Sequence, residues 1–435
     1  MAFGAPREPV HQPVGELPAW PVFLLFSAFG LWWLLGLGAF AVAIVSLPMA
    51  VLLVQRRRIE VPPAFSLWVL LLLWTLAASS QLSSTKLIGF GVRFSNYAGC
   101  AILFIYIYNA RERLHRRAVL AALSSFYLLV LFGGYLGMFV PHGSISTPTE
   151  RLLPSSVASN EYVRALVHPA FAEVQQPYGS PRAFYRPSAP FPYTNSWGCN
   201  MALLVPLLIA MLVEVRSPRV RIALGAALLA AAVPAAASLN RGMFIGLGVG
   251  TAYVAVRLAI RGRVVPLAAV VGSVGVAAVG AVATGVFADL QQRLSYSHTN
   301  TGRLAIYRES FDGALSSPLL GNGAPRASET VDVAVGTQGE IWNVMFSFGF
   351  VALLWFVGWF VAAWWLSRRA PSVADLWISA VLVVAIATFF FYGYDGPQLA
   401  VVMTAAALAV RDRTGARAIR PTTASTRQML RPVIG

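Results

Sequence analysis

Long apolar segments and short polar connections alternate along nearly the whole chain of 435 residues. Most of the apolar segments approach the roughly 20 residues that an α-helix needs to cross a bilayer. Because they are continuous, without an apolar–polar alternation, they predict helices and not the strands of a barrel. We expect about twelve transmembrane helices, at about 20–37, 39–54, 64–80, 94–110, 118–140, 196–213, 222–238, 242–258, 264–287, 341–366, 374–392 and 397–410.

The composition agrees with an all-α, polytopic membrane protein. Hydrophobic residues make up 57% of the chain and charged residues only 11%, whereas a soluble domain has roughly a quarter of its residues charged. The first span lacks a small-residue cleavage site and is followed by a second span, so we interpret it as an anchor and not as a removed signal peptide. We predict an N-terminal tail at 1–19, one transmembrane domain at 20–410, and a basic, disordered tail at 411–435.

The placement of arginine predicts the orientation. Short basic clusters between the apolar segments all fall on one side if the chain crosses the membrane an even number of times. The positive-inside rule makes that side the cytoplasm and places both termini there. The clusters are Arg56, Arg57 and Arg58; Arg111, Arg113, Arg116 and Arg117; Arg216, Arg219 and Arg221; Arg257, Arg261 and Arg263; Arg368 and Arg369; and Arg411, Arg413, Arg417, Arg420, Arg427 and Arg431.

The same dispersion decides how the net charge of +16 is interpreted. The basic residues are spread over many connections and are not gathered on one soluble domain, so we expect no nucleic-acid partner. The opposite side of the membrane receives two long external loops, at about 141–195 and 288–340. They are much longer than the few residues that connect packed helices, and we expect an external substrate to be handled there.

The middle of every predicted span lacks Asp, Glu, Lys, Arg and His. Ion-coupled transporters usually carry such a residue near the bilayer midplane, so this pattern argues against a proton-coupled carrier. Gly242, Gly246 and Gly250 recur at four-residue spacing within one span. That spacing is typical of closely packed membrane helices.

Arginines on the predicted external side carry the chemical signal. Arg93, Arg186, Arg241 and Arg303 stand there against the positive-inside bias, and Arg241 lies in a very short turn that offers little reason for a charge except function. A guanidinium group matches phosphate oxygens in a bidentate manner, which suits a lipid-linked phosphate or diphosphate. For the other external arginines we favour contacts with lipid headgroups or loop carboxylates: Arg182, Arg293, Arg308 and Arg326.

Three segments resemble the O-antigen ligase and O-antigen polymerase superfamily of bacterial membrane glycosyltransferases. The first runs from Arg186 to Asn195 ahead of the span that begins Ser196-Trp197-Gly198. The second is the turn Ser238-Leu-Asn-Arg-Gly242. The third is Gly302-Arg303 through Tyr307, followed by Ser317-Pro-Leu-Leu-Gly-Asn-Gly323 and by Trp342 to Gly349. Where the family carries a His-Asn pair, this chain has Gln338-Gly339, and Glu340 is the candidate base.

The resemblance implies a metal-independent glycosyl transfer in the bacterial inner membrane, without a cofactor. The donor would be a glycan on polyprenyl diphosphate, and the acceptor a hydroxyl of a glycan or lipid. Other cell-envelope assembly proteins are further candidate partners, besides membrane lipid itself. Arg93, Arg186, Arg241 and Arg303 would bind the diphosphate, with Arg241, Arg303 and Glu340 acting in catalysis. Weaker candidates for glycan contact are Tyr185, Asn195, Gln338 and Trp342, and for Trp342 and Trp197 we favour anchoring at the membrane interface.

Two other functions stay open at this point. A peptidoglycan-polymerase-type glycosyltransferase would need a carboxylate in its large external loop, for which Asp312 or Asp332 could serve. A flippase or transporter of lipid-linked glycan would perform no chemistry. His298 is a second candidate base, although a histidine in a polar loop is more often a bystander. An interfacial, solvated carboxylate is the structural alternative for Glu340.

Overall fold

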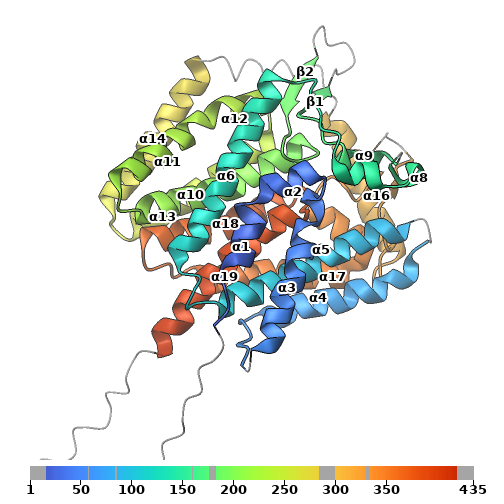
Figure 1. Ribbon diagram of the computed structural model, residues 1–435, viewed down its shortest axis with the longest axis horizontal. Coiled ribbons are helices and arrows are strands. Elements are labelled where there is room, and N and C mark those ends of the chain that lie inside the picture. Colours follow the sequence, from blue (N-terminus) through green and yellow to red (C-terminus); the bar gives the residue numbers. More distant parts are fainter. Residues whose placement is uncertain are drawn as a thin grey trace, which may run out of the picture.

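The computed structural model describes residues 16–56, 58–83, 86–158, 160–175, 183–283, 299–329 and 333–418. It is a mostly helical bundle (Figure 1). The first half contains α1 (Trp20–Phe26), α2 (Phe29–Leu35), η1 (Gly38–Phe40), α3 (Ala41–Gln55), α4 (Phe65–Ala78), η2 (Ser79–Gln81), α5 (Leu87–Asn109), α6 (Arg116–Phe139), α7 (Pro148–Leu152), α8 (Ser155–Ala158), α9 (Glu161–Val167), β1 (Ala172–Gln175) and β2 (Phe184–Pro187).

The second half contains longer helices and one short pair of strands. Its elements are α10 (Thr194–Glu214), α11 (Pro218–Ala230), α12 (Ala232–Ser238), α13 (Arg241–Ile260), α14 (Val264–Ala283), α16 (Thr299–Ser316), β3 (Arg326–Ala327), β4 (Ala334–Val335), α17 (Glu340–Ser367), α18 (Val373–Thr388) and α19 (Gly396–Ala418). The strands form two antiparallel pairs, β1 with β2 and β3 with β4.

Every apolar segment expected from the sequence is helical over most of its length. Among the described residues, seven helices are long and apolar enough to cross a membrane, and four shorter helices are also apolar. The protein is therefore a multi-pass membrane protein. One boundary differs from expectation: α19 continues past 410 to Ala418, so residues 411–418 belong to a helix and not to a disordered tail. Arg411 is buried and donates to the carbonyls of Ile107 and Leu114.

Arginine-to-carbonyl contacts gather many helix termini at one end of the bundle. Arg56 after α3 donates to the Asn109 carbonyl at the end of α5. Arg261 after α13 donates to the Ala370 carbonyl between α17 and α18. Arg116 at the start of α6 forms ion pairs with Glu214 at the end of α10 and with Asp375 at the start of α18. The contacts of Arg411 bring the C-terminal part of α19 to the same end. We call this the basic end.

Contacts at the opposite end join the other termini of the same helices. Glu340 at the start of α17 contacts Tyr97 in the middle part of α5 and Tyr394 before α19. Asn240 before α13 donates to the Thr194 carbonyl at the start of α10. Both long loops, which hold β1, β2 and α16, reach this end. Successive long helices therefore run in alternating directions between the two ends.

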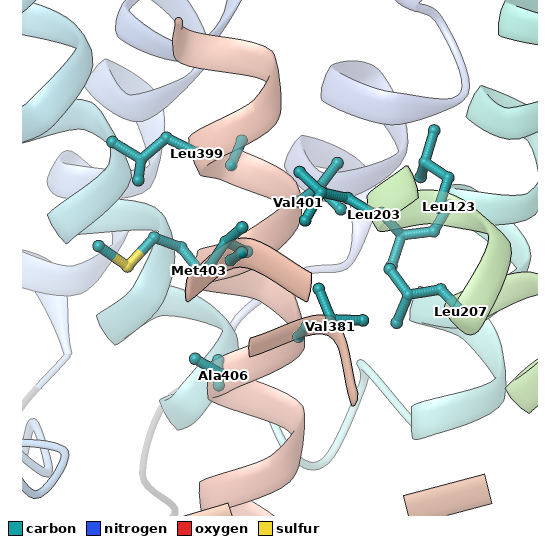
Figure 2. Packing of buried hydrophobic residues seen from close by; sticks show 14 of the residues in the cluster. Leu123, Leu203, Leu207, Val381, Leu399, Val401, Met403 and Ala406 are labelled. Atoms are coloured by element: carbon teal, nitrogen blue, oxygen red, sulfur yellow. The ribbon is translucent and has the colours of Figure 1, made fainter. Parts of the chain in front are cut away.

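The core lies around α19 and the helices that flank it. Residues 399–403 and 405–408 of α19 have no exposed surface, and Figure 2 shows Val401 on the side of α19 that faces Leu203 of α10 and Val381 of α18. By contrast, α11, α13 and α14 expose long apolar side chains such as Ile222, Ile260 and Val265. This distribution is the one expected of a bundle whose outer helices face lipid.

The Pro-Leu-Leu-Gly-Asn-Gly segment has a structural role at a break in α17. Gly349 has φ 80° and ψ 178°, a conformation that interrupts the helix and is essentially restricted to glycine. The loop 317–323 docks onto the break: the Asn322 N–H donates to the Phe346 carbonyl, the Gly323 N–H to the Ser347 carbonyl, and the Phe350 N–H to the Pro318 carbonyl. The loop thus satisfies backbone groups that the broken helix leaves unpaired.

We predict that Gly349→Ala strongly destabilises the protein. An added Cβ would lie 2.2 Å from the Leu319 carbonyl oxygen, and the backbone conformation alone costs about 1–3 kcal/mol for a residue other than glycine. The apparent melting temperature of the purified protein should fall. Gly225→Ala in α11 is the matched control, because a Cβ there meets nothing within 4 Å and alanine favours the helix. Equal melting temperatures for the two variants would contradict the docking.

Candidate functional site

The paired strands β1 and β2 hold Arg186 at the end of the bundle that lies opposite the basic end. Glu173 pairs with Arg186 across the two strands, and the side chain of Arg186 is 4% exposed. Its Nε donates to the Ser238 carbonyl at 2.8 Å and its Nη1 to the Gln175 Oε1 at 3.2 Å, while Nη1 lies 3.7 Å from a carboxylate oxygen of Glu173. Burial lowers the pKa of the Arg186 guanidinium, and Glu173 opposes that effect.

The predicted short turn before α13 brings a second arginine to the same place. Leu239 adopts a left-handed conformation with φ 48°, which reverses the chain between α12 and α13. Asn240 locks the turn: its Nδ2 donates to the Thr194 carbonyl at 3.1 Å, and its Oδ1 accepts from the Tyr392 hydroxyl. Arg241 follows as the first residue of α13 and is partly exposed.

Arg303 on α16 is the third member of this group. The charges of Arg303 and Arg241 both lower the pKa of the Arg186 guanidinium, which places the three charges in one neighbourhood at this end of the bundle. The Nε of Arg303 is buried and has no hydrogen-bond partner in the described part of the chain. An unpaired buried donor is costly, and an anionic ligand would remove that cost. We call Arg186, Arg241 and Arg303 the arginine triad.

Two aromatic side chains lie beside the arginine triad. The rings of Tyr307 and Trp342 stack with centroids 4.4 Å apart and an interplanar angle of 15°. Trp342 Nε1 donates to the Phe390 carbonyl at 3.1 Å, and the Tyr307 hydroxyl donates to the Phe390 carbonyl at 3.3 Å and to the Gln338 carbonyl at 3.4 Å. Tyr307 lies one helical turn after Arg303 on α16, so it links the Arg303 segment to Trp342 and to the Gln338 carbonyl.

Glu340 and Arg93 form a separate buried cluster. The Glu340 side chain has no exposed surface, so its interpretation as a solvated interfacial carboxylate is wrong. Arg93 Nη1 lies 3.2 Å from Oε1 and 3.4 Å from Oε2, the Tyr97 hydroxyl donates to Oε1, and the Tyr394 N–H donates to Oε2 at 2.8 Å. Glu340 therefore uses both oxygens to hold Arg93, Tyr97 and the turn before α19.

The turn 389–395 links this cluster to the arginine triad. The Tyr392 carbonyl accepts from the Glu340 N–H at 2.7 Å, while its hydroxyl binds Asn240 in the turn before Arg241. Asp395 closes the turn beside Arg93. Burial raises the pKa of the Asp395 carboxyl, Arg93 lowers it, and Glu340 raises it further. Sequence reasoning missed Tyr97, Tyr392 and Asn240 in these roles, and only the position of Asn240 in the singled-out turn pointed to one of them.

Other predicted residues lie apart from the arginine triad or outside the described chain. Tyr185 is exposed on the opposite face of β2 from Arg186 and packs against His142. Asn195 is partly buried near the start of α10, and Asp312 is exposed on α16. Trp197 is fully buried and donates to the Val130 carbonyl, so its expected interfacial role is wrong. Arg326 contacts Glu309 and Glu329, as expected. The positions outside the described residues are Tyr178, Arg182, Arg293, His298 and Asp332.

The described residues contain no group of three or more metal-ligating His, Cys, Asp or Glu side chains. Cys100 and Cys199 are both free and buried. No protein-family model and no curated protein matches this chain.

We predict that Arg93 and Glu340 are energetically coupled. Removing one partner of a buried ion pair typically costs about 3–5 kcal/mol, because the other charge stays buried and unpaired. Arg93→Met and Glu340→Gln should each lower the melting temperature, and the double variant should lose less than the two single losses together. The measurement is thermal unfolding of the four purified proteins as a double-mutant cycle. Simple additivity would show that the two side chains do not depend on each other.

Proposed function

We propose that this protein is a membrane glycosyltransferase that acts on a glycan carried by polyprenyl diphosphate. The observation that carries the proposal is the arginine triad, in which Arg186, Arg241 and Arg303 come from three separate segments and the buried Nε of Arg303 has no partner among the described residues. Like charges held near one another repel, and although Glu173 pairs with Arg186, a bound anion would offset the remaining repulsion. A diphosphate has the charge and the oxygen geometry that guanidinium groups match.

We also propose that the chain crosses the bacterial inner membrane twelve times, with the basic end in the cytoplasm. Support comes from the alternating direction of the helices and from the gathering of Arg56, Arg116, Arg261 and Arg411 at that end. The positive-inside rule then assigns the opposite end to the outer leaflet. A lipid-linked glycan at that end would meet the arginine triad near the level of its diphosphate.

The proposed reaction is a displacement at the anomeric carbon of the donor. An acceptor hydroxyl forms the new C–O bond, the bond between the anomeric carbon and the phosphate oxygen breaks, and polyprenyl diphosphate leaves. The leaving diphosphate gains one negative charge, and the hydroxyl proton passes to it or to water. Arg186, Arg241 and Arg303 stabilise that developing charge, which is electrostatic catalysis by preorganised donors. The reaction in this form needs no metal ion and no cofactor.

The contacts of Glu340 favour a positioning role. Both carboxylate oxygens already accept hydrogen bonds from Arg93, Tyr97 and the Tyr394 N–H. Glu340 would hold Arg93 at the edge of the site, where a quarter of that side chain is exposed and can reach a ligand oxygen. Tyr307 and Trp342 would contact the first sugar or the lipid.

Glycan length separates polymerisation from ligation: cells without the protein accumulate single repeat units on lipid in the first case and long chains in the second.

We predict that Arg303→Lys lowers glycan transfer by about 100-fold or more, the usual effect of removing one preorganised donor. Lysine keeps the charge but loses the planar fork. The measurement is conversion of lipid-linked glycan by membranes that contain equal amounts of each variant. Arg308→Lys is the matched control, because Arg308 lies on the same helix and is exposed, and its activity should stay within about twofold of the unmodified protein.

Unchanged transfer by Arg303→Lys would contradict the enzymatic proposal. A flippase predicts a different result from the same strains: without the protein, the lipid-linked glycan would stay in the inner leaflet, out of reach of external reagents. Transfer lost while the glycan is still exposed at the outer leaflet would favour chemistry over transport.

The proposed orientation predicts the reactivity of single cysteines introduced after Cys100 and Cys199 are replaced by alanine. Leu152→Cys, at a side chain that is 85% exposed in α7, should react with a membrane-impermeant maleimide in intact spheroplasts. Ile59→Cys, 43% exposed at the basic end, should react only after permeabilisation. Reaction of both cysteines before permeabilisation would refute the orientation.

A further inference from the structure

A large open cavity lies at the basic end, far along the helices from the arginine triad. Its volume is about 940 Å³. It lies where α10 ends and where α6, α11 and α18 begin. Four of its lining residues are arginines and one is an acid. The lining is His115, Arg116, Arg117, Ala118, Val213, Glu214, Val215, Arg216, Arg221, Ser372 and Ala374.

The charges in this cavity do not cancel. Glu214 is engaged by Arg116 and lies 3.9 Å from Arg117 Nε, and Asp375 behind the wall also holds Arg116. Arg216 and Arg221 have no ion pair with a carboxylate in the part of the chain that the structure describes, and Arg221 Nη2 donates only to the Val215 carbonyl. Both side chains are exposed at the rim, so the cavity keeps a net positive charge.

Backbone donors face the same region. The helix α6 begins at the cavity wall without a side-chain cap, and so does α11. The first N–H groups of a helix have no partner within the helix and carry a partial positive charge. Among the described residues, no backbone acceptor is bonded to the N–H group of Arg117. Uncapped helix starts beside arginine side chains are a favourable environment for a phosphate group.

The surroundings indicate that this phosphate belongs to a lipid. Val213 is 47% exposed at the cavity wall, and Val220 and Ile222 are 41% and 72% exposed on α11 next to Arg221. The outward face of α11 continues as apolar surface to Leu229, which is 72% exposed. A ligand with an anionic head and apolar chains would match both surfaces at once.

We propose that this cavity binds the phosphate headgroup of an anionic phospholipid, with Arg216 and Arg221 as its principal side-chain ligands and the starts of α6 and α11 as backbone donors. Basic pockets between membrane helices are suited to such headgroups. The bound lipid would join α10 and α11 to α6 and α18 at the basic end. This site is independent of the proposed glycosyl transfer, because its residues lie at the other end of the bundle.

The test measures lipid-dependent stabilisation of the full-length protein purified in detergent. Phosphatidylglycerol is titrated into the micelles, and phosphatidylcholine and inorganic phosphate are titrated separately. A ligand that binds only the folded state raises the melting temperature with its concentration. Phosphatidylglycerol should raise the melting temperature, and the other two should have little effect. The double variant Arg216→Gln with Arg221→Gln should need roughly 30-fold more phosphatidylglycerol for the same rise.

Arg219→Gln is the matched control, because Arg219 lies on the same helix and is exposed, but does not line the cavity. It should respond to phosphatidylglycerol within about twofold of the unmodified protein. Equal responses of the double variant and the unmodified protein would overturn the proposal. Equal stabilisation by inorganic phosphate would overturn the assignment to a lipid. Native mass spectrometry of retained phospholipid checks the same site without unfolding: the double variant should lose the bound lipid, and Arg219→Gln should keep it.

Discussion

A buried carboxylate organises the end of the bundle where the candidate site lies. Glu340 has no exposed surface, and a charge without water must be matched by nearby donors. Arg93 and Tyr97 of α5 and the Tyr394 N–H provide those donors. Three segments far apart in the sequence therefore meet at one side chain. The turn 389–395 then takes a fixed path, which places Tyr392 against Asn240 and so fixes the start of α13 at Arg241.

Arginine side chains are used differently at the two ends of the bundle. At the basic end, several arginines donate to carbonyls at helix termini, as Arg56, Arg261 and Arg411 do. These bonds tie neighbouring helices together, which is a structural use of the charge. In the arginine triad, Arg186 also binds a carbonyl, but Arg303 retains a buried Nε without a partner among the described residues. In the triad, the hydrogen bond of Arg186 holds that side chain in place, and the Nε of Arg303 remains to donate to a ligand.

The helices could be predicted from the sequence because lipid exposure requires long apolar runs. That requirement leaves a strong one-dimensional signal, as in the runs around 118–140 and 196–213. Breaks within helices left a weaker signal. Gly349 ends one of the segments that the sequence singled out, but its role depends on the loop 317–323, which docks onto it from elsewhere in the chain. Likewise, nothing local to Arg411 indicated that α19 continues, since its carbonyl partners belong to α5 and the connection after it.

The arginines of the candidate site stood out in the sequence because a charge on the predicted external side contradicts the usual bias. Their partners could not, because Tyr97, Tyr392 and Asn240 are neutral and lie in or beside apolar segments, where they resemble ordinary core residues. Glu340 was visible as a carboxylate, but its burial depends on three segments that only the fold brings together. A carboxylate that holds an arginine has its oxygens occupied by donors, whereas a carboxylate that acts as a base needs an oxygen free to accept a proton. Full burial with both oxygens occupied favours the first, so in this fold Glu340 is better suited to holding Arg93 than to receiving a proton.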